Sequence, residues 1–366
     1  MRPVAIIGAR AVTQEAFMGA RLEEAVFDTV AAALEDAGVV REELDSVALG
    51  ASDELDGRSI TSMLLAMPAG AFLKDEIRTT SGMHALALQA MRIQSGMFDL
   101  GVVVSWSKPS ETSSVDSVQW TSLDPLIGRD LGLIDPIASA VMASAYLERF
   151  DRDCGDLDRR SEEKARSGAG ASSDESASTS SGVFSSGVSY PFRAEHLAPI
   201  VDGVTAVVVA SPRTVEGLDL RRPPVWLRGL GWATDSYSLS ERTLWEWSTL
   251  RRVTKDALDR AGCQVEEIDR FEIDDYSVMH EVLAVEALGL TEPGTGFDYL
   301  SAAEENGRQI NPTGGSFGGY PPVCAGLWRV AEAHRHLTDD GVKRALAHGT
   351  TGIAAQGHEV AVLERG

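Results

Sequence analysis

The sequence predicts an α/β protein whose two similar halves pack as alternating layers, in the order α/β/α/β/α. The first observation behind this prediction is an internal repeat: ALEDAGVVREELDSV at residues 33–47 recurs as ALDRAGCQVEEIDRF at residues 257–271. The second is the pattern around each copy, where an amphipathic helical segment precedes the repeat and a run typical of a buried strand follows it. Because strands that alternate with helices usually form covered parallel sheets, we expect parallel sheets with helices on both faces.

The first half is predicted to alternate between strands and helices. Its N-terminus, MRPVAIIGARAV, has only a short apolar run, which is typical of a buried first strand and not of a signal peptide. The helix LEEAVFDTVAAALEDA ends at Gly38, a residue type favoured just after the last helical turn. The segment RTTSGMHALALQAMRIQSGMFDLGVVVSWS predicts a turn, a helix and a buried strand, and the apolar run in HLAPIVDGVTAVVVAS closes this half.

The second half is predicted to repeat this order. The helix WSTLRRVTKDALDRA ends at Gly262, and a strand-like run, RFEIDDYS, follows it. The segment GGYPPVCAGLWRVAEAHRHLTDDGVKRALAHG again predicts a turn, a helix and a strand. We therefore expect an N-terminal half at residues 1–220 and a C-terminal half at residues 221–366. Within the first half, the serine-rich segment at residues 166–189 has little to bury and is predicted to be an exposed loop.

The composition argues against several classes of protein. The chain has 366 residues, 43% of them hydrophobic, and a net charge of −22. Nucleic acid is not an expected partner, because phosphate binding needs a basic surface. No apolar run approaches the roughly 18 residues that a membrane span needs. The three cysteines, Cys154, Cys263 and Cys324, are widely separated and lack metal-binding spacing, so we expect a cytoplasmic protein without a bound metal.

Four motifs connect the chain with a known family. The segment INPTGGSFGGYPPVCAG is similar to the thiolase block N-x-x-G-G followed by G-H-P-x-G, and VDGVTAVVVAS is similar to the thiolase S-D-G-A-A-A strand. FEIDDYSVMHEVLAVEALGL resembles the E-x-x-D-x-F segment and helix of sterol-carrier-protein-type thiolases, and RTTSGMHAL occupies the place of the nucleophile turn, C-x-S-G. On these motifs the chain resembles the thiolase superfamily over nearly its whole length, which implies a thiolase-like fold.

The departures from the family pattern concern the reacting groups. Thr79 stands where a thiolase has its cysteine nucleophile, and Tyr320 stands where the G-H-P histidine would activate that cysteine. The position of the second thiolase cysteine falls near LAHGTTGIAAQG, which has His348 and glycines but no cysteine. Because a threonine hydroxyl without a paired base is a poor nucleophile, Claisen chemistry through an acyl-enzyme is not expected.

The resemblance is strongest to a cysteine-less subgroup, the Ltp2-like steroid side-chain aldolases. It implies a retro-aldol cleavage of a β-hydroxyacyl-CoA, with a steroid as the expected acyl group, to a ketone and propionyl-CoA. It also implies an acyl-CoA substrate that brings its own coenzyme A, no further cofactor, a homodimer, and a partner protein of the OB-fold and zinc-ribbon type. For the dimer, we expect pairing through the strand DLGVVVS of the first half.

The resemblance also implies a set of site residues. Tyr320 and Tyr276 are the expected acid and base, one deprotonating the hydroxyl and the other holding it or returning a proton to the enolate. His348 and Asp275 are expected beside them. The oxyanion site is expected to include Asn311, Gly314, Gly315, Thr79 and Ser81.

Other interpretations remain open at this point. Ser81 or Thr79 would be the nucleophile if the protein were an acyltransferase, and a non-catalytic thiolase-like subunit would also lack the cysteines. Ser81 is equally well explained as a helix N-cap, and Asp275 as a structural carboxylate. We expect His280 to be a core histidine and Cys324 to be buried and inert.

Overall fold

The computed structural model describes residues 3–14, 20–112, 114–171, 188–302 and 309–366. Within these ranges the ten strands are β1 (Val4–Gln14), β2 (Ser46–Gly50), β3 (Asp75–Thr79), β4 (Leu100–Ser107), β5 (Asp202–Ala210), β6 (Val225–Thr234), β7 (Arg270–Glu272), β8 (Gln309–Ile310), β9 (Arg344–Thr351) and β10 (Gly357–Arg365). The α-helices of the same ranges are α1 (Leu22–Ala37), α2 (Thr61–Leu65), α3 (Gly82–Gln94), α4 (Val115–Ser122), α5 (Asp135–Arg149), α6 (Cys154–Ala171), α7 (Pro212–Gly217), α8 (Ser248–Ala261), α9 (Val278–Ala287), α10 (Gly296–Ala302) and α11 (Ala325–Asp339).

The strands show the internal duplication directly. Their order is β3-β2-β4-β5-β1 followed by β6-β10-β9-β7-β8, so the second five strands repeat the first five in reverse spatial order. The two sets join where Val4–Ile6 of β1 pairs antiparallel with Val225–Leu227 of β6. Helices α1 and α8 are counterparts, and both end at a glycine in the left-handed conformation, Gly38 at φ 70° and Gly262 at φ 68°. Both predicted helix ends are confirmed.

The prediction of parallel sheets was only partly right. Strands β2, β3 and β4 are parallel, as are β7, β8 and β9, but β5 and β10 run antiparallel to their neighbours. The short connection between β9 and β10 explains one reversal, because a few residues can join only antiparallel neighbours. The sheets are therefore mixed.

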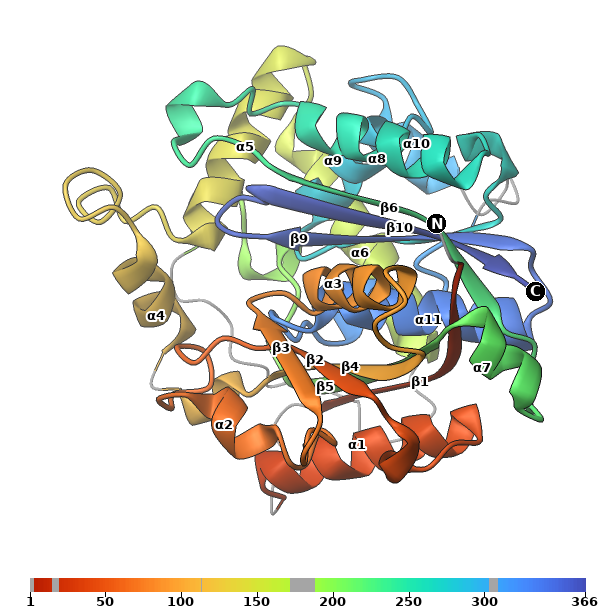
Figure 1. Cartoon of the computed structure of the whole chain (residues 1–366). Helices are drawn as coiled ribbons and strands as arrows, with labels where there is room; N and C mark the ends of the chain where they lie inside the picture. Colours follow the sequence, from red (N-terminus) through yellow and green to blue (C-terminus); the bar gives the residue numbers. More distant parts are fainter. Residues whose placement is uncertain (1–2, 15–19, 113, 172–187, 303–308) are drawn as a thin grey trace.

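The layers follow the predicted order α/β/α/β/α (Figure 1). Helix α1 covers the outer face of the first set of strands, and α3 and α11 lie between the two sets. Helices α8, α9 and α10 cover the outer face of the second set. This arrangement confirms the predicted fold class. One apolar core lies under α1, one surrounds α3 and α11, and a third lies between the second set of strands and its outer helices and contains Tyr276 and Tyr320.

Two predictions about particular segments need correction. The segment at residues 166–189, predicted as a loop, begins within helix α6, which runs to Ala171, while residues 172–187 lie outside the described part of the chain. The strand expected to form the dimer, DLGVVVS, is β4, which pairs with β2 on one side and β5 on the other. A strand with two neighbours has no free edge, so β4 cannot pair with a second copy.

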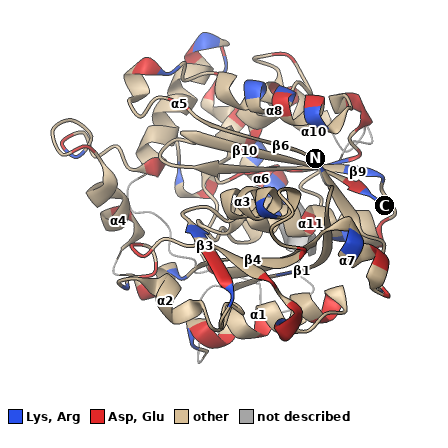
Figure 2. Cartoon of the chain, viewed as in Figure 1, with Lys and Arg blue, Asp and Glu red and all other residues tan. Residues whose placement is uncertain are grey.

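The surface is acidic but mixed in sign. Figure 2 shows that acidic and basic residues both occur along the outer helices and loops, with no long run of basic residues in this view. None of the helices in the described residues is both long and apolar enough to span a membrane.

A buried ion network links the second half to helix α6. Arg329 on α11 is fully buried, and its Nη2 lies 2.8 Å from Asp275 Oδ1, while its Nη1 lies 3.5 Å from Glu272 Oε2. Lys164 on α6 places its Nζ 2.6 Å from Asp275 Oδ2 and 3.1 Å from Glu281 Oε1. Two cations from different helices therefore meet on the one carboxylate of Asp275, next to the end of β7.

We predict that Arg329→Met lowers the free energy of unfolding by about 3–5 kcal/mol, because it leaves buried carboxylates without compensation. Arg335→Met on the same helix is the matched control: the Arg335 side chain is 40% exposed and pairs with Glu332, so its loss should stay under about 1 kcal/mol. Denaturant unfolding measures both variants. Equal losses would contradict a structural role for the network.

Candidate active site

The structure brings the two predicted tyrosines together. Tyr276 lies in the turn between β7 and α9, and Tyr320 lies just before α11, yet their ring centroids are 5.0 Å apart. One segment of the first half holds both: the N–H of Ala198 donates to the carbonyl of Tyr276, and the N–H of Tyr320 donates to the carbonyl of Pro199, each at 2.7 Å. The tyrosine pair, Tyr276 and Tyr320, is therefore fixed by backbone contacts.

The glycines before Tyr320 allow close approach to other parts of the protein. A Cβ on Gly315 would lie 2.1 Å from Asp275 Oδ2, and one on Gly319 would lie 2.9 Å from Val201 Cγ2. Gly315 has φ 66° and Gly319 has φ 145°, conformations that side chains rarely adopt. These two glycines let the chain wrap the buried carboxylate and then present Tyr320 beside Tyr276.

Both phenols are neutral in this environment. Burial, followed by the negative charges of Asp135, Asp116 and Asp274, raises the pKa of Tyr276 well above its ordinary value. Burial, followed by Asp274 and Asp135, raises the pKa of Tyr320 in the same way. Among the described residues, neither hydroxyl has a hydrogen-bond partner. The pair is suited to donating hydrogen bonds and protons, whereas the predicted use of one tyrosine as a base would need a lowered pKa.

Asp274, not Asp275, is the carboxylate that accompanies the tyrosine pair. Its Oδ1 accepts the N–H of Tyr276 at 3.1 Å, and its Oδ2 accepts the hydroxyl of Thr350 at 2.9 Å. Burial, the largest single influence, opposes its charge, but His280, whose Nδ1 lies 3.8 Å from Oδ1, together with His348 and the N–H of Tyr276, holds the pKa of Asp274 below its usual value. Asp274 is therefore a stable negative charge beside the site.

Asp275 is held in the buried ion network, as the structural interpretation of this residue expects. Its carboxylate is occupied by Lys164, by Arg329 and by the N–H of Ser316, which donates to Oδ1 at 2.8 Å. Both oxygens of Asp275 are bound in the buried network, which fits the structural interpretation of this residue. Its expected catalytic role beside the tyrosine pair stays a prediction.

Asn311 and its glycines also have structural contacts. Asn311 has φ 45°, and its side chain accepts the N–H of Ile273 at 2.8 Å and donates to the carbonyl of Ile273 at 3.1 Å. The N–H of Gly314 donates back to the carbonyl of Asn311 at 2.9 Å. Asn311 therefore braces the end of β7, the strand that leads to the tyrosine pair, and the oxyanion role expected of Asn311, Gly314 and Gly315 stays a proposal.

A buried group of histidines and a tryptophan lies beside Asp274. His348 on β9 and His358 on β10 have near-parallel rings, with Nε2 of His348 3.2 Å from Nδ1 of His358. The ring of Trp247 packs on both and on His280. Burial lowers the pKa of His348 to about 4 and that of His358 well below its ordinary value, so both are neutral at neutral pH.

His348 was expected from the sequence, whereas two members of this group, His358 and Trp247, were not. His358 lies on β10, which pairs with β9 so that Val360 is opposite His348. This register places His358 close to His348. The hairpin register was the one signal that pointed to it. Trp247 stands alone before α8, and no motif in the sequence identifies it.

Thr79 and Ser81 lie in a turn that contacts the segment after Tyr320, since the N–H of Gly82 donates to the carbonyl of Val323 at 3.3 Å. Thr79 ends β3, and Ser81 caps α3, with its Oγ accepting the N–H of His84 at 3.3 Å and donating to Glu359 Oε2 at 2.6 Å. Burial raises the pKa of Glu359 to about 7, against the hydrogen bond from Ser81. No hydrogen bond among the described residues joins Thr79 or Ser81 to either tyrosine.

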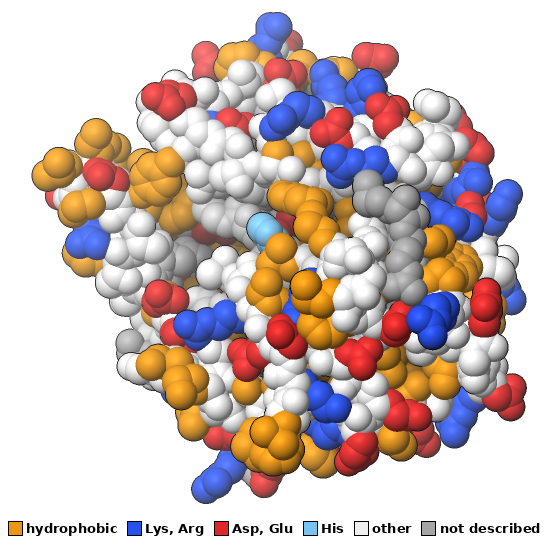
Figure 3. All heavy atoms as spheres, in the orientation of Figure 1, with side chains coloured by type: hydrophobic (Ala, Val, Ile, Leu, Met, Phe, Trp, Pro, Cys, Tyr) orange, Lys and Arg blue, Asp and Glu red, His pale blue; other side chains and the backbone are white. Residues whose placement is uncertain are grey.

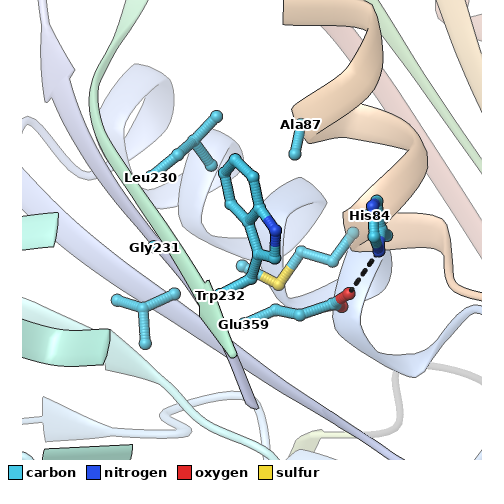
Figure 4. Close-up of a pocket in the computed structure, with 8 residues that line it drawn as sticks. His84, Ala87, Leu230, Gly231, Trp232 and Glu359 are labelled. Carbon is cyan, nitrogen blue, oxygen red and sulfur yellow. Dashed lines mark ion pairs between the residues drawn. The ribbon is translucent and has the colours of Figure 1, made fainter. Parts of the chain in front are cut away.

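Figure 4 shows a narrow pocket between α3 and strands β6 and β10, where His84, Glu359 and Trp232 face one another. His84 Nδ1 lies 3.8 Å from Glu359 Oε1. Figure 3 shows a histidine at the surface among hydrophobic side chains, and His84 is the histidine that is not buried in the described chain. The pocket adjoins the place of the thiolase nucleophile turn.

The cysteines offer no thiolate at the tyrosine pair. Cys324 is fully buried before α11, as predicted, and burial raises the pKa of its thiol. Cys263 is also buried, and Cys154 is half-buried on α6. In the described ranges, no group of three or more His, Cys, Asp or Glu side chains is arranged to hold a metal ion.

We predict that the tyrosine pair does not ionise at its ordinary pKa of about 10 in the folded protein. Above that pH the unfolded chain loses protons that the folded chain retains, so the free energy of unfolding falls as pH rises. In the double variant Tyr276→Phe/Tyr320→Phe, the free energy of unfolding should fall less steeply as pH rises above about 10. Phenolate absorbance measures the ionisation, and titration of both residues near pH 10 in the folded state would contradict the prediction.

The comparisons with known proteins agree with the fold. Residues 231–365 match the family model described as thiolase C-terminal domain-like. Acetyl-CoA acetyltransferase from Methanothermobacter thermautotrophicus is 23% identical over 96% of this chain and 95% of its own. Human sterol carrier protein 2 is 27% identical over 156 residues, which cover 40% of this chain and 28% of that protein.

Three solved structures have similar folds. The Ltp2-ChsH2(DUF35) aldolase has a TM-score of 0.79 at 18% identity, covering 99% of this chain and 98% of that one. A monomeric SCP2-thiolase-like protein of Mycobacterium smegmatis has a TM-score of 0.72 at 19% identity, covering 99% and 76%. Human mitochondrial 3-ketoacyl-CoA thiolase has a TM-score of 0.75 at 13% identity, covering 100% and 99%. Together with the five-layered fold, these findings show that the chain has the thiolase fold and that its residues 231–365 match the thiolase C-terminal domain-like family model.

Proposed function

We propose that this protein is a carbon–carbon lyase that cleaves a β-hydroxyacyl-CoA by a retro-aldol reaction. The proposed products are a ketone and propionyl-CoA, with a steroid as the acyl group, and the substrate itself carries the coenzyme A. The observation that carries the proposal is the tyrosine pair, which stands in a thiolase fold at the place of the histidine that would activate a cysteine. The fold similarity to a protein described as an aldolase supports the same reaction class.

The chemistry of the tyrosine pair fits this reaction. A base takes the proton of the β-hydroxyl, the oxygen forms the ketone, and the Cα–Cβ bond breaks with its electrons moving into the thioester enolate. A neutral phenol donates a hydrogen bond to the enolate oxygen, and a phenol proton is then transferred to Cα. The raised pKa of both tyrosines keeps them in the donating form at neutral pH. His348, neutral and with Nδ1 unpartnered among the described residues, is proposed to contact the reacting end of the substrate.

A second candidate function is acyl transfer through Ser81. The short hydrogen bond from Ser81 Oγ to Glu359, whose pKa lies about 7, pairs a hydroxyl with a carboxylate able to accept its proton. The acetyl-CoA acetyltransferase that matches the chain over most of its length favours this function. Acyl label retained on Ser81 after incubation with acyl-CoA would support acyl transfer over cleavage. Inactivity with every thioester would instead indicate a non-catalytic subunit.

For the partners, we propose a homodimer that pairs through β3 and not through β4. Strand β3 lies at the edge of its sheet and has β2 as its neighbour. Its sequence, Asp-Glu-Ile-Arg-Thr, is self-complementary: two antiparallel copies centred on Ile77 place Glu76 of each opposite Arg78 of the other. This charge pairing supports a second copy at the edge.

We also propose an OB-fold partner protein and a cytoplasmic location. The aldolase of similar fold is named together with a DUF35 component, ChsH2, which supports a partner for this chain. The three free cysteines suit a reducing compartment.

We predict that Tyr320→Phe lowers kcat for cleavage of a β-hydroxyacyl-CoA by about 10²–10³-fold, the usual effect of removing one oxyanion donor. The fold should stay intact, because the backbone contacts of Tyr320 remain. Tyr299→Phe is the matched control, since the Tyr299 hydroxyl on α10 has no partner among the described residues. Cleavage by Tyr320→Phe at the wild-type rate would contradict the proposal.

We predict that Glu76→Lys shifts the protein from dimer to monomer, because the substituted lysine of each copy would then lie opposite Arg78 of the other. Light scattering of the wild type and the variant measures the change. Glu216→Lys, a charge reversal on α7, is the control and should leave the dimer intact. A monomeric wild type, or a dimeric Glu76→Lys variant, would contradict pairing through β3.

A further inference from the structure

We propose that Asp135 is the general base that takes the proton from the substrate's β-hydroxyl. The inference rests on the proposed retro-aldol function and supplies the base that this reaction requires. It concerns a residue that no motif in the sequence identifies, at the start of helix α5 in the insertion between β4 and β5. The carboxylate of Asp135 would contact the reacting oxygen directly.

Asp135 is held in place from two sides, with one oxygen left over. Its Oδ1 accepts the N–H of Ala354, in the turn between β9 and β10, at 2.6 Å. Its own N–H donates to the side-chain oxygen of Gln119 on α4 at 3.0 Å. Arg242 fixes the same turn by donating to the carbonyls of Ile353 and Ala354. Within the described residues, Oδ2 of Asp135 has no hydrogen-bond partner.

The face of α5 that carries Asp135 is directed at the tyrosine pair. Ser139 lies one turn further along this face, and its Oγ is 3.2 Å from Nε2 of His280. The ring of His280 packs on the ring of Tyr276 at 5.6 Å, and Tyr276 packs on Tyr320. Helix α5 thus contacts the side chains next to Tyr276, and the charge of Asp135 acts on both tyrosines.

The other charged or basic groups are less suitable as the base. Asp274 has both oxygens in hydrogen bonds and a lowered pKa, so it holds protons weakly. His348 has a pKa of about 4, and the phenols are protonated. Burial raises the pKa of Asp135, while His280 and Arg242 oppose the rise and Asp274 adds to it. A carboxylate with a raised pKa is a stronger base than an ordinary one.

The step balances with these groups alone. The O–H bond of the substrate breaks and its proton passes to Oδ2 of Asp135, while the C–O bond becomes the ketone carbonyl. The electrons of the Cα–Cβ bond form the enolate, and one phenol of the tyrosine pair gives its proton to Cα. Transfer of the proton from Asp135 to that phenolate, directly or through solvent, restores both groups. No oxidant, reductant or further reactant is consumed.

The test compares Asp135→Asn with wild type in the cleavage of a β-hydroxyacyl-CoA. Asparagine retains an acceptor for the Ala354 N–H, so the fold should persist while kcat falls by about 10²–10⁴-fold and KM changes little. The wild-type kcat/KM should fall as pH drops through the raised pKa of Asp135, and the variant should lose this acid limb. Asp130→Asn, an exposed aspartate just before α5, is the control and should behave as wild type.

Rescue by an added base separates catalysis from positioning. In Asp135→Ala, formate should restore kcat in proportion to its concentration, which a merely structural role would not allow. Asp135→Glu keeps a carboxylate base, so its kcat should exceed that of Asp135→Asn. This second variant keeps the test valid if one of the other variants fails to fold. If the wild type cleaves the thioester and Asp135→Asn is equally active with an unchanged pH profile, the assignment of Asp135 as the base is overturned, but the proposed function is not. A wild type that does not cleave the thioester would overturn the proposed function and this inference with it.

Discussion

The candidate site depends on the buried carboxylate of Asp275 and on the two cations that hold it. Arg329 comes from the central helix α11 and Lys164 from the peripheral helix α6, so their shared contact fixes the distance between layers. Neutralised in this way, Asp275 anchors the turn that follows β7. The residues on either side of it, Asp274 and Tyr276, both contact His280. Gly315 wraps the same carboxylate, and the chain then continues to Tyr320. The two tyrosines meet because both of their segments are tied to one buried charge.

The electrostatics of the site follow from burial. Apolar surroundings disfavour charge, so the two phenols and the imidazoles of His348 and His358 remain neutral, while contacts with His280, His348 and the N–H of Tyr276 keep Asp274 ionised. Neutral donors facing a position where negative charge develops are the arrangement that stabilises an enolate. The proposed retro-aldol cleavage uses these neutral donors to stabilise an oxyanion without an acyl-enzyme.

Much of the architecture followed from the sequence, since the repeat and its two terminal glycines indicated the duplication, and the motif around Tyr320 pointed to the right turn. The errors have physical causes. Strand direction in β5 and β10 depends on connections whose course the periodicity does not reveal, and an apolar strand such as β4 has the same pattern whether it is central or at an edge. Asp274 and Asp275 are adjacent, and the sequence pattern does not reveal that Asp275 joins the buried ion network while Asp274 accepts the N–H of Tyr276. Trp247 and Asp135 reach the site through tertiary packing and carry no local signal, and only the register of the β9–β10 hairpin indicates His358.

The central claim is that a thioester enolate forms in this site and receives a proton there. Cleavage of a β-hydroxyacyl-CoA in deuterated water, followed by mass spectrometry of the released acyl-CoA, tests it most directly. The account predicts a shortened acyl-CoA with a single solvent-derived deuterium at Cα, formed in equal amount with the ketone. Acyl groups retained on the protein, or a shortened acyl-CoA without deuterium at Cα, would contradict it.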